Sequence, residues 1–324
     1  MNPPKLFHSL IGARGFEPPT PCAQGRCASQ TALRPVRSLA ILAHWQAICF
    51  DSNVGKVTGL RNAIAEFVHD GDSVALECFS HLVPFAAGHE IIRQQRRDLT
   101  LIRMSTDIIY DQMIGMGCAK KLIFSWAGNP GLGLLHRFRD AEENDWPRPL
   151  EIEEYTHATL AAAFVAGAAG LPFGTLSCCP QTDLLKHTPA LSSIKCPFTG
   201  EEVAAVRAMK PDVTIVHAQC ADEDGNVQLW GVVGIQKEAV LAAKSVIVTV
   251  EEIGKRLEPT PGGIVIPSWV ISSVVHTPGG ARPSYVHGYY GRDSAFYREW
   301  DAIARDRDRF IQWMEENVLE RVPA

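Results

Sequence analysis

The stretch that decides the fold is KPDVTIVHAQCADEDGNVQLWGVVGIQKEAVLAAKSVIVTVEEI, residues 210–253. Two of its apolar runs, residues 213–216 and 246–250, are rich in β-branched residues and short enough to be buried strands. Between them lie an Asp/Gly-rich turn, residues 222–226, and a segment with helical spacing, residues 236–244. Continuous apolar strands joined by a crossover helix are typical of a parallel sheet that is covered on both faces. The sequence therefore predicts an α/β protein.

Length and composition limit the classes of function. The chain has 324 residues, enough for one large core or two modest cores. Its 46% apolar and 21% charged residues are ordinary for a soluble globular protein, and its formal net charge of −5 offers no basic surface for nucleic acid. No apolar run approaches the roughly 20 residues that a membrane span requires. Nine cysteines without the regular spacing of a secreted disulfide scaffold indicate reduced thiols and a cytoplasmic protein.

The first 54 residues differ from the rest of the chain. They are rich in Pro, Arg, Cys and Gln and have no sustained periodicity. A targeting peptide, a disordered extension and a non-native segment are the three alternatives. We favour the third, because GARGFEPPTPCAQGRCA, residues 12–28, resembles the false translation of a transfer-RNA gene, and Val54 would then be at or near the natural start. N-terminal mass spectrometry would test this hypothesis, and native peptides from residues 16–37 would exclude it.

From residue 55 onward, strand-like and helix-like segments alternate. This alternation predicts a single domain, residues 55–320, with an open, mostly parallel sheet and helices on both faces. In such sheets functional side chains gather on loops beyond the carboxyl ends of the strands. A final helix is expected at residues 301–319, where the apolar side chains share one face. The other expected strands are residues 73–76, 99–104, 121–126, 151–154 and 174–178, and the other expected helices are residues 59–69, 84–93, a short one near Asp111, 134–143 and 156–168.

Several blocks of the sequence carry a family resemblance. DGDSVALECFSHLVPFAAGHEIIRQ, residues 70–94, resembles the signature loop of the alpha subunits of family I CoA-transferases. PDVTIVHAQCADEDGNVQLWG together with IVTVEEI resembles the second conserved block of these subunits. Further similar stretches lie at residues 111–115, 171–173 and 276–293, so the resemblance covers essentially residues 55–318. Within the family, the alpha chain of glutaconate CoA-transferase is the type that this sequence resembles most.

The resemblance implies a heteromeric enzyme. Members of the family pair with a similarly folded beta subunit, and they move CoA between carboxylates by a ping-pong route through a glutamyl-CoA thioester. The nucleophilic glutamate lies on the beta subunit, so this chain is expected to lack it and to be inactive alone. The expected substrates are an acyl-CoA thioester and a carboxylic acid, with no permanently bound cofactor. A carboxylate attacks a thioester only in a water-poor site with oxyanion donors, and an interface between two subunits can supply such a pocket.

The loop after the first strand departs from the family pattern. The family reads Gly-Gly-Phe where this chain reads Glu77-Cys78-Phe79. Two glycines allow positive φ and close backbone approach, which Glu and Cys restrict. Glu77 is therefore either a carboxylate that enters the site or a strand-end residue satisfied by neighbouring amides. Phe79, Ser80 and His81 are expected to line the substrate pocket, and helix capping is the alternative for Ser80 and His81.

Two further loops carry expected substrate-binding residues. Thr106 and Asp107 lie beyond a strand and are placed to line the pocket, although Asp107 is equally suited to be a helix N-cap. Gly128, Asn129 and Gly131 belong to a glycine-rich turn that is suited to hold an anion with its backbone amides at the start of the next helix. A simple connection is the alternative for this turn.

An acidic strand suggests a different reaction. Glu151 and Glu153 alternate onto one face, Glu154 lies on the other, and His157 opens the next helix. In the related steroid-ring-cleaving CoA-thioester hydrolases, an acidic residue of the alpha chain in this region acts in place of the beta-subunit glutamate, and Glu154 or His157 lies nearest that position. Hydrolysis is therefore the first alternative to transfer, and a solvated strand edge is the structural one. A non-catalytic ligand-sensing domain is the second alternative, because the same architecture resembles sugar-phosphate isomerase and sensor domains.

No metal site is expected. Cys178 and Cys179 are adjacent and would point to opposite faces of a strand, and no histidine stands at ligand spacing. His217 is expected to hold the sheet together, and Glu251 is expected to be a strand-end residue rather than a nucleophile. The Gly/Pro-rich aromatic stretch at residues 278–291 is expected to contact the beta subunit, with a packed surface loop as the alternative.

Overall fold

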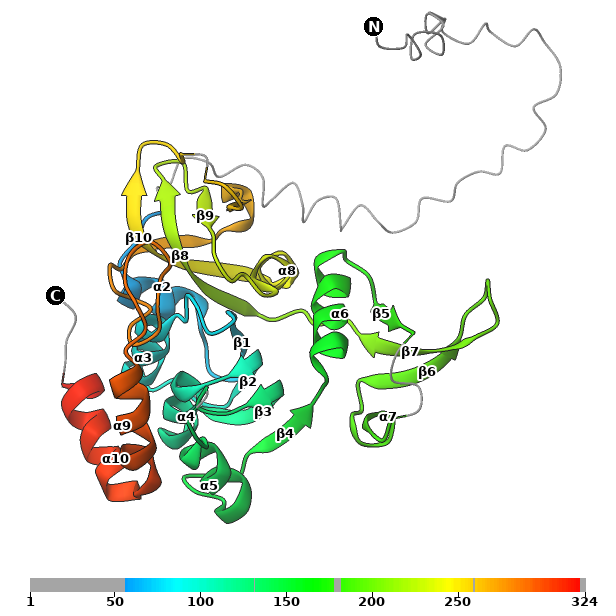
Figure 1. Ribbon diagram of the computed structural model, residues 1–324, viewed down its shortest axis with the longest axis horizontal. Helices are drawn as coiled ribbons and strands as arrows, with labels where there is room; N and C mark the ends of the chain where they lie inside the picture. The colour runs from blue at the N-terminus through cyan, green and yellow to red at the C-terminus, as the bar shows by residue number, and fades with distance from the viewer. Residues whose placement is uncertain (1–55, 131, 178–181, 259, 321–324) are drawn as a thin grey trace, which may run out of the picture. The chain divides into compact units, whose positions relative to one another are not determined.

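A nine-stranded sheet forms the centre of the computed structural model, which describes residues 56–130, 132–177, 182–258 and 260–320 (Figure 1). The predictions for residues 1–54, Gly131, Cys178 and Cys179 lie outside these described residues. The strand order is β11–β9–β8–β1–β2–β3–β4, with β10 paired to both β8 and β12. The strands are β1 (Ser73–Leu76), β2 (Leu99–Thr106), β3 (Ala119–Ala127), β4 (Glu151–Glu154), β8 (Val213–Asp222), β9 (Val227–Leu229), β10 (Ser245–Gly254), β11 (Ile264–Ile266) and β12 (Ser273–His276).

Most of this sheet is parallel. Only β9 runs antiparallel to its neighbours β8 and β11, and all other pairings in the sheet are parallel. The hairpin between β8 and β9 turns at Gly225, whose φ of 83° is accessible to glycine without steric cost. The open, mostly parallel sheet predicted from the alternation is confirmed.

Helices cover both faces of the sheet because neighbouring strand residues alternate between two cores. In β2, Leu101 packs in a core with α2, α3, α4, α9 and α10, whereas Ile102 packs in a core with α6 and α8. β1 divides in the same way, with Leu76 in the first core and Ala75 in the second. The helices are α2 (Leu60–Phe67), α3 (Phe85–Arg93), α4 (Ile108–Gly115), α5 (His136–Asn144), α6 (His157–Ala168), α8 (Gln236–Ala242), α9 (Ser294–Arg305) and α10 (Arg307–Met314), and a short 3₁₀ helix spans Ser268–Val270.

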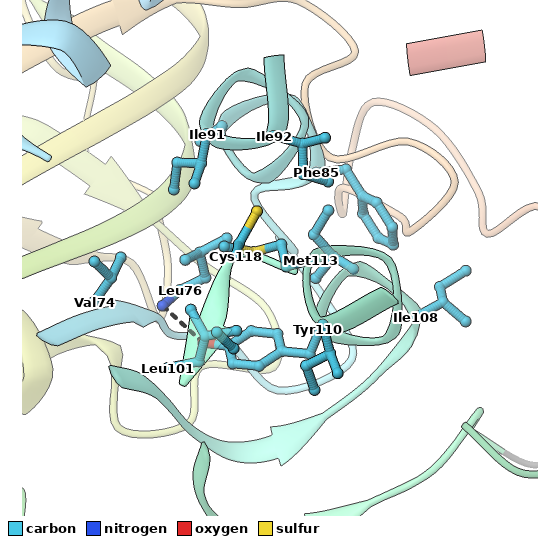
Figure 2. Close-up of a cluster of buried hydrophobic side chains, with 14 of the residues drawn as sticks. Val74, Leu76, Phe85, Ile91, Ile92, Leu101, Ile108, Tyr110, Met113 and Cys118 are labelled. Carbon is cyan, nitrogen blue, oxygen red and sulfur yellow. Dashed lines mark hydrogen bonds between the residues drawn. The ribbon is translucent and has the colours of Figure 1, made fainter. Parts of the chain in front are cut away.

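Figure 2 shows the first core, where α3 and α4 lie over the strands. Tyr110 of α4 is fully buried here, and its hydroxyl donates to the Ile102 carbonyl at 2.7 Å and accepts from the Leu76 amide at 3.1 Å. A buried hydroxyl without partners would cost a few kcal/mol, so these two bonds allow a polar tip inside an apolar core. Tyr110 thereby fastens α4 to both β1 and β2 just below the ends of these strands.

The strand expected at residues 174–178 does not belong to the parallel sheet. It forms β5 (Phe173–Leu176) in a separate antiparallel sheet of order β5–β7–β6, with β6 at Leu191–Lys195, β7 at Glu202–Arg207 and the short helix α7 at Leu184–His187 nearby (Figure 1). β5 packs closely against α6. The two backbones are so near at Gly174 that an added Cβ would lie 2.8 Å from the Ala162 carbonyl oxygen. The alternation of elements did not reveal that this strand pairs with later strands instead of β4.

The final helix is also different from the prediction. Residues 301–319 do not form one helix, because Asp306 has extended backbone angles, ends α9 and caps α10 by accepting from the Arg309 amide at 2.9 Å. A π-helical turn, Glu315–Leu319, follows α10. The apolar face is nevertheless buried as expected, since Ile303 and Phe310 both pack in the first core. Within the described ranges, no helix is long and apolar enough to cross a membrane.

Candidate functional site

The candidate site lies at the carboxyl ends of β1, β2, β3 and β4. These strands are parallel neighbours, so the loops that follow them meet at one edge of the sheet. The register places Ser105 opposite Trp126, and Phe124 opposite Glu154. Loops from four separate parts of the sequence therefore converge here.

The loop after β1 has an unusual backbone. Ser80 and Leu82 have φ angles of 57° and 59°, in the left-handed region that side chains other than glycine seldom adopt. A neighbouring segment holds this shape: the Leu82 amide donates to the Tyr285 carbonyl at 3.1 Å, and the Ser284 hydroxyl donates to the Ser80 carbonyl at 3.1 Å. Such strain persists only where surrounding structure fixes it, and it often marks a functional loop.

His81 is buried and helps to hold the loop after β1 in this conformation. Its Nε2 accepts from the His287 amide at 2.9 Å, and burial lowers the pKa of His81 to about 4. The ring is therefore neutral near pH 7. Neither Ser80 nor His81 caps the next helix, because α3 begins after Pro84 without a side-chain cap. The capping alternative is thus wrong, and substrate binding by Ser80 and His81 stays a prediction.

Glu77 lies at the end of β1 and is buried. Its carboxylate accepts from the Met104 amide at 3.2 Å, which is the arrangement expected of a strand-end residue satisfied by an amide. Burial raises the pKa of Glu77 to about 7, although the nearby Arg103 guanidinium and the Met104 amide oppose the shift. Glu77 therefore changes its protonation state near neutral pH.

Arg103 is the centre of a buried polar cluster behind the loop. Its guanidinium donates to both carboxylate oxygens of Asp107, at 2.9 and 3.3 Å, and to the Cys78 sulfur at 2.8 Å. Arg103, Cys78 and Asp107 are almost completely inaccessible to solvent. Burial raises the pKa of the Cys78 thiol, so this sulfur is a neutral acceptor and not a thiolate. The cluster ties the end of β1 to the end of β2.

The two predicted pocket residues at the end of β2 both make hydrogen bonds within the chain. Asp107 caps α4 by accepting from the Ile109 amide, which confirms the N-cap interpretation. Thr106 is buried and donates its hydroxyl to the Trp126 carbonyl at 2.9 Å. Their role in lining a substrate pocket stays a prediction.

His157 is exposed at the start of α6 and lies beside the loop after β1. Its two ring nitrogens each lie 3.2 Å from a serine hydroxyl, Nε2 from Ser105 and Nδ1 from Ser125. Because Ser125 donates its proton to the Met104 carbonyl at 2.7 Å, its oxygen can only accept from Nδ1. In the neutral ring Nε2 then accepts from the Ser105 hydroxyl. The Phe79 ring meets His157 edge-on, with 6.5 Å between ring centroids.

The acidic side chains of β4 have other partners than His157. Glu151 and Glu153 both pair with Lys121 at 2.7 Å, which confirms that they share a face of β4. Glu154 is exposed, and its carbonyl accepts from the Thr188 hydroxyl. Of the two candidates for hydrolysis, only His157 has side-chain contacts with the β2 and β3 ends.

The glycine-rich turn after β3 does not lead directly into a helix N-terminus. α5 begins at His136, and its first amides are already used, because the Asp111 carboxylate accepts from Arg137 and Phe138 at 2.8 and 2.9 Å. Asn129 instead donates its side chain to the Tyr297 carbonyl at 2.7 Å and bridges to Gly133. The helix dipole is therefore not available to an anion in this turn, and substrate binding by Gly128 and Asn129 stays a prediction.

Apolar side chains lie exposed around the candidate site. Phe79, Trp126 and Val232 are 38%, 42% and 48% exposed. Val232 belongs to a segment over the loop after β1, since a Cβ at Gly231 would touch the His81 ring and one at Gly234 would touch Phe79. Large exposed apolar side chains around a polar site are typical of a surface that another chain covers.

The segment at residues 278–291 packs on its own chain. Tyr290 donates to Glu251 at 2.6 Å, and the Gly279 amide donates to the same carboxylate at 2.7 Å. His217 is buried between Thr249 and Glu251, at 2.8 and 2.7 Å, which confirms its structural role. Although burial opposes ionisation of Glu251, the hydrogen bonds from His217 and Tyr290 hold its pKa below the usual value. Glu251 is thus a structural anchor for this segment.

Sequence reasoning missed Ser105, Ser125 and Arg103. Each lies in the carboxyl-terminal part of an apolar strand, where the rule for parallel sheets places functional side chains. That position was the available signal. Among the described residues, no group of three or more His, Cys, Asp and Glu side chains is placed to hold a metal ion.

Comparisons with known proteins agree on one family. The sequence profile described as Coenzyme A transferase matches residues 57–277. The A subunit of 3-oxoadipate CoA-transferase from Pseudomonas knackmussii is 58% identical over 259 residues, which cover 80% of this chain and 92% of that protein. The A subunit of glutaconate CoA-transferase from Acidaminococcus fermentans is 33% identical over 289 residues, with coverage of 82% and 89%. The crystal structure of glutaconate coenzyme A-transferase from the same organism superposes with a TM-score of 0.75 at 32% identity, covering 82% of this chain and 89% of that one.

Proposed function

This chain belongs to the coenzyme A transferase family, and on that premise we propose that it is the alpha subunit of a heteromeric enzyme that moves CoA from an acyl-CoA to a carboxylic acid. The proposal includes a beta subunit that carries the nucleophilic glutamate and a ping-pong route through a glutamyl-CoA thioester. The 58% identity over 92% of the A subunit of a 3-oxoadipate CoA-transferase carries this proposal. The same relative supports 3-oxoadipate, a short dicarboxylic acid, as the acceptor.

The geometry supports a division of labour between two chains. The buried candidates of this chain are already bonded: Glu77 to an amide, and Asp107 to Arg103. By contrast, Phe79 and His157 are exposed at the carboxyl edge of the sheet, and Trp126 is exposed near the end of β3. We infer that the beta subunit covers this edge and that Phe79, Ser105 and His157 form this chain's wall of the substrate pocket.

His157 has a defined chemical task in this proposal. In its neutral form, Nε2 holds the Ser105 hydroxyl, and this pair can reorient to donate to a carbonyl or carboxylate oxygen of the substrate. A donor aimed at the developing oxyanion stabilises the attack of the partner's carboxylate on the thioester. The covered apolar rim would keep water from hydrolysing the thioester intermediate.

The decisive experiment is co-expression of this chain with the beta-subunit gene and an assay with succinyl-CoA and 3-oxoadipate. We expect transfer by the complex, none by this chain alone, and a covalent CoA adduct that hydroxylamine or borohydride traps on the partner. An active complex that releases free CoA to water and forms no adduct would overturn transfer in favour of hydrolysis.

Hydrolysis is the second candidate, on the resemblance to the steroid-ring-cleaving hydrolases alone, which implies an acidic residue of the alpha chain near Glu154 or His157. A Glu154→Gln variant separates the two reactions. Glu154 is exposed and its side chain is not needed for transfer, so transfer should persist in the variant, whereas a hydrolase that used this carboxylate would lose its activity.

A further inference from the structure

A cavity of about 530 Å³ lies among α3, α4, α9, α10 and the segment at residues 282–291. Its volume falls within the range of small-molecule sites, which is about 300 to 1,000 Å³. None of the side chains assigned to the proposed substrate pocket lines it. The proposed transfer reaction therefore does not use the side chains that line this cavity.

One wall of the cavity holds a buried polar group without a partner. Gln112 of α4 is completely buried, and its side-chain oxygen is bonded to His89 Nε2 at 2.8 Å. Its amide nitrogen, Nε2, has no hydrogen-bond partner. A buried donor without a partner costs about 1–3 kcal/mol, so an acceptor oxygen from a water or a ligand in the cavity would stabilise it.

A positively charged side chain, Arg282, lines the same cavity. The Arg282 guanidinium lies 4.3 Å from the centre of the Tyr290 ring, a cation–π contact that leaves its donors open. Arg93 also lines the cavity but is largely engaged, because it pairs with Glu90 at 3.1 Å and donates to the Val318 carbonyl at 2.7 Å. Arg282 is thus the charge that a ligand would meet.

Two acidic side chains, Asp293 and Glu299, also line the cavity and oppose the Arg282 charge to different degrees. Asp293 caps α9 through one carboxylate oxygen, Oδ1, which accepts from the Ala295 and Phe296 amides at 3.1 and 3.0 Å, so the α9 N-terminus partly offsets its charge. Glu299 is exposed and opposes an anion. The remaining wall is apolar and aromatic, formed chiefly by Phe85, Phe296 and Trp313.

From this juxtaposition of an unpaired buried amide donor, an available guanidinium and three aromatic walls, we propose that the cavity binds a small carboxylate with an aromatic or bulky apolar body. The carboxylate pairs with Arg282 and accepts from Gln112, and the apolar body packs between the aromatic side chains. The site is separate from the substrate pocket and does not depend on the proposed transfer reaction.

The cavity also has a direct path to the loop after β1. Ser284 lines the cavity and donates its hydroxyl to the Ser80 carbonyl at 3.1 Å, and the adjacent Tyr285 holds Leu82. A ligand in the cavity therefore touches the segment that maintains the strained loop. Binding is expected to stabilise that segment.

Phenylacetate is the probe for a test by isothermal titration calorimetry on the purified full chain. We expect one site per chain and binding at least tenfold weaker for 2-phenylacetamide, which keeps the shape and loses the charge. The Arg282→Met variant should weaken phenylacetate binding at least tenfold. The Arg298→Met variant is the matched control, because Arg298 is exposed on α9 and does not line the cavity.

Two further variants distinguish a specific site from a general charge effect. Gly291→Leu should abolish binding without unfolding the chain, because a Cβ at Gly291 meets no atom within 4 Å and the larger side chain occupies cavity space. Glu299→Gln should tighten binding a few-fold by removing the opposing charge. Absence of binding at millimolar phenylacetate, or equal affinities in the wild type and Gly291→Leu, would refute the proposal.

Discussion

Two polar groups at the same edge of the sheet differ in what they do. The Arg103 cluster, formed by Arg103, Cys78, Asp107 and Glu77, is buried, and its bonds stay within the chain. The His157 group, formed by His157, Ser105 and Ser125, borders solvent beside Phe79. Both groups lie where parallel strands end, so position alone does not separate them. From this difference we assign the first group to stability and propose the second group, whose histidine is exposed, for chemistry.

The largest effect is expected from Arg103→Met. This change leaves the Asp107 carboxylate buried without its partner, and breaking a buried pair costs about 3–5 kcal/mol. Urea unfolding followed by circular dichroism measures the loss. Arg139→Met is the matched control, because Arg139 and Glu143 form a pair with the same spacing of four residues, and 48% and 46% of these two side chains are exposed. The control should lose less than about 1 kcal/mol.

A double variant sharpens this prediction. Arg103→Met combined with Asp107→Leu removes both charges, so it should cost less than the sum of the single changes. Simple additivity would show that the buried pair does not act as a unit.

The next largest effect is a pH dependence from Glu77. Below about pH 4.5 the carboxyl is protonated in the folded and unfolded states alike. As pH rises from about 4.5 to about 7, the unfolded chain releases this proton while the folded chain keeps it, so folding stability falls. Glu77→Gln removes this loss and should stabilise the chain at pH 8 by up to about 3 kcal/mol, with little difference at pH 4.5.

Thermal unfolding of both proteins across this pH range measures the effect. A variant curve parallel to that of the wild type would show that Glu77 is not the titrating group. Loss of transfer activity in Glu77→Gln without loss of stability would instead place this carboxylate in the reaction.

His157→Ala should lower activity and leave stability almost unchanged. Because the ring is exposed, its removal should change the free energy of unfolding by no more than about 0.5 kcal/mol. In the complex with the beta subunit, kcat/KM should fall about 10- to 100-fold, since the ring that positions the Ser105 hydroxyl is lost. His187→Ala is the control, an exposed histidine in α7, and should keep full activity. Equal activities of the two variants would remove His157 from the site.

The smallest effect is expected at Ser80, whose φ is 57°. Ser80→Gly relieves the backbone strain but raises the conformational entropy of the unfolded chain. The net change in the free energy of unfolding should therefore stay within about 1 kcal/mol. Ser80→Val places a β-branched residue in the left-handed region and should be about 1–2 kcal/mol less stable than Ser80→Gly. The control variant Ser193→Val, in the strand β6, should leave the free energy of unfolding nearly unchanged. Equal stability of the two Ser80 variants would mean that the loop relaxes out of this conformation.

Periodicity in the sequence predicted the strands β1, β2, β3, β4, β8 and β10 of the central sheet and the helices α2, α3, α6 and α8, but not the strands β11 and β12. Apolar runs such as those in β8 and β10 are continuous because both faces of these strands are buried, and that pattern is local. The same local logic failed for β5 and for the C-terminal helices. Partner choice in a sheet depends on residues far away in the chain, and the break at Asp306 depends on one extended residue within a helical pattern.

The candidate site was predicted only in outline. The sequence alone determined the α/β class and the family resemblance, and it singled out the loop at residues 77–81 as a candidate site. Only the tertiary structure decided the partners of the polar residues at that edge. Arg103 and Ser105 lie two residues apart in β2 and are both buried, yet Arg103 pairs with the buried Asp107 whereas Ser105 contacts the exposed His157. A strand sends alternate side chains to opposite faces, but Arg103 and Ser105 share a face by that rule. Their different roles come from the loops and helices that pack around the strand end, which no local pattern encodes.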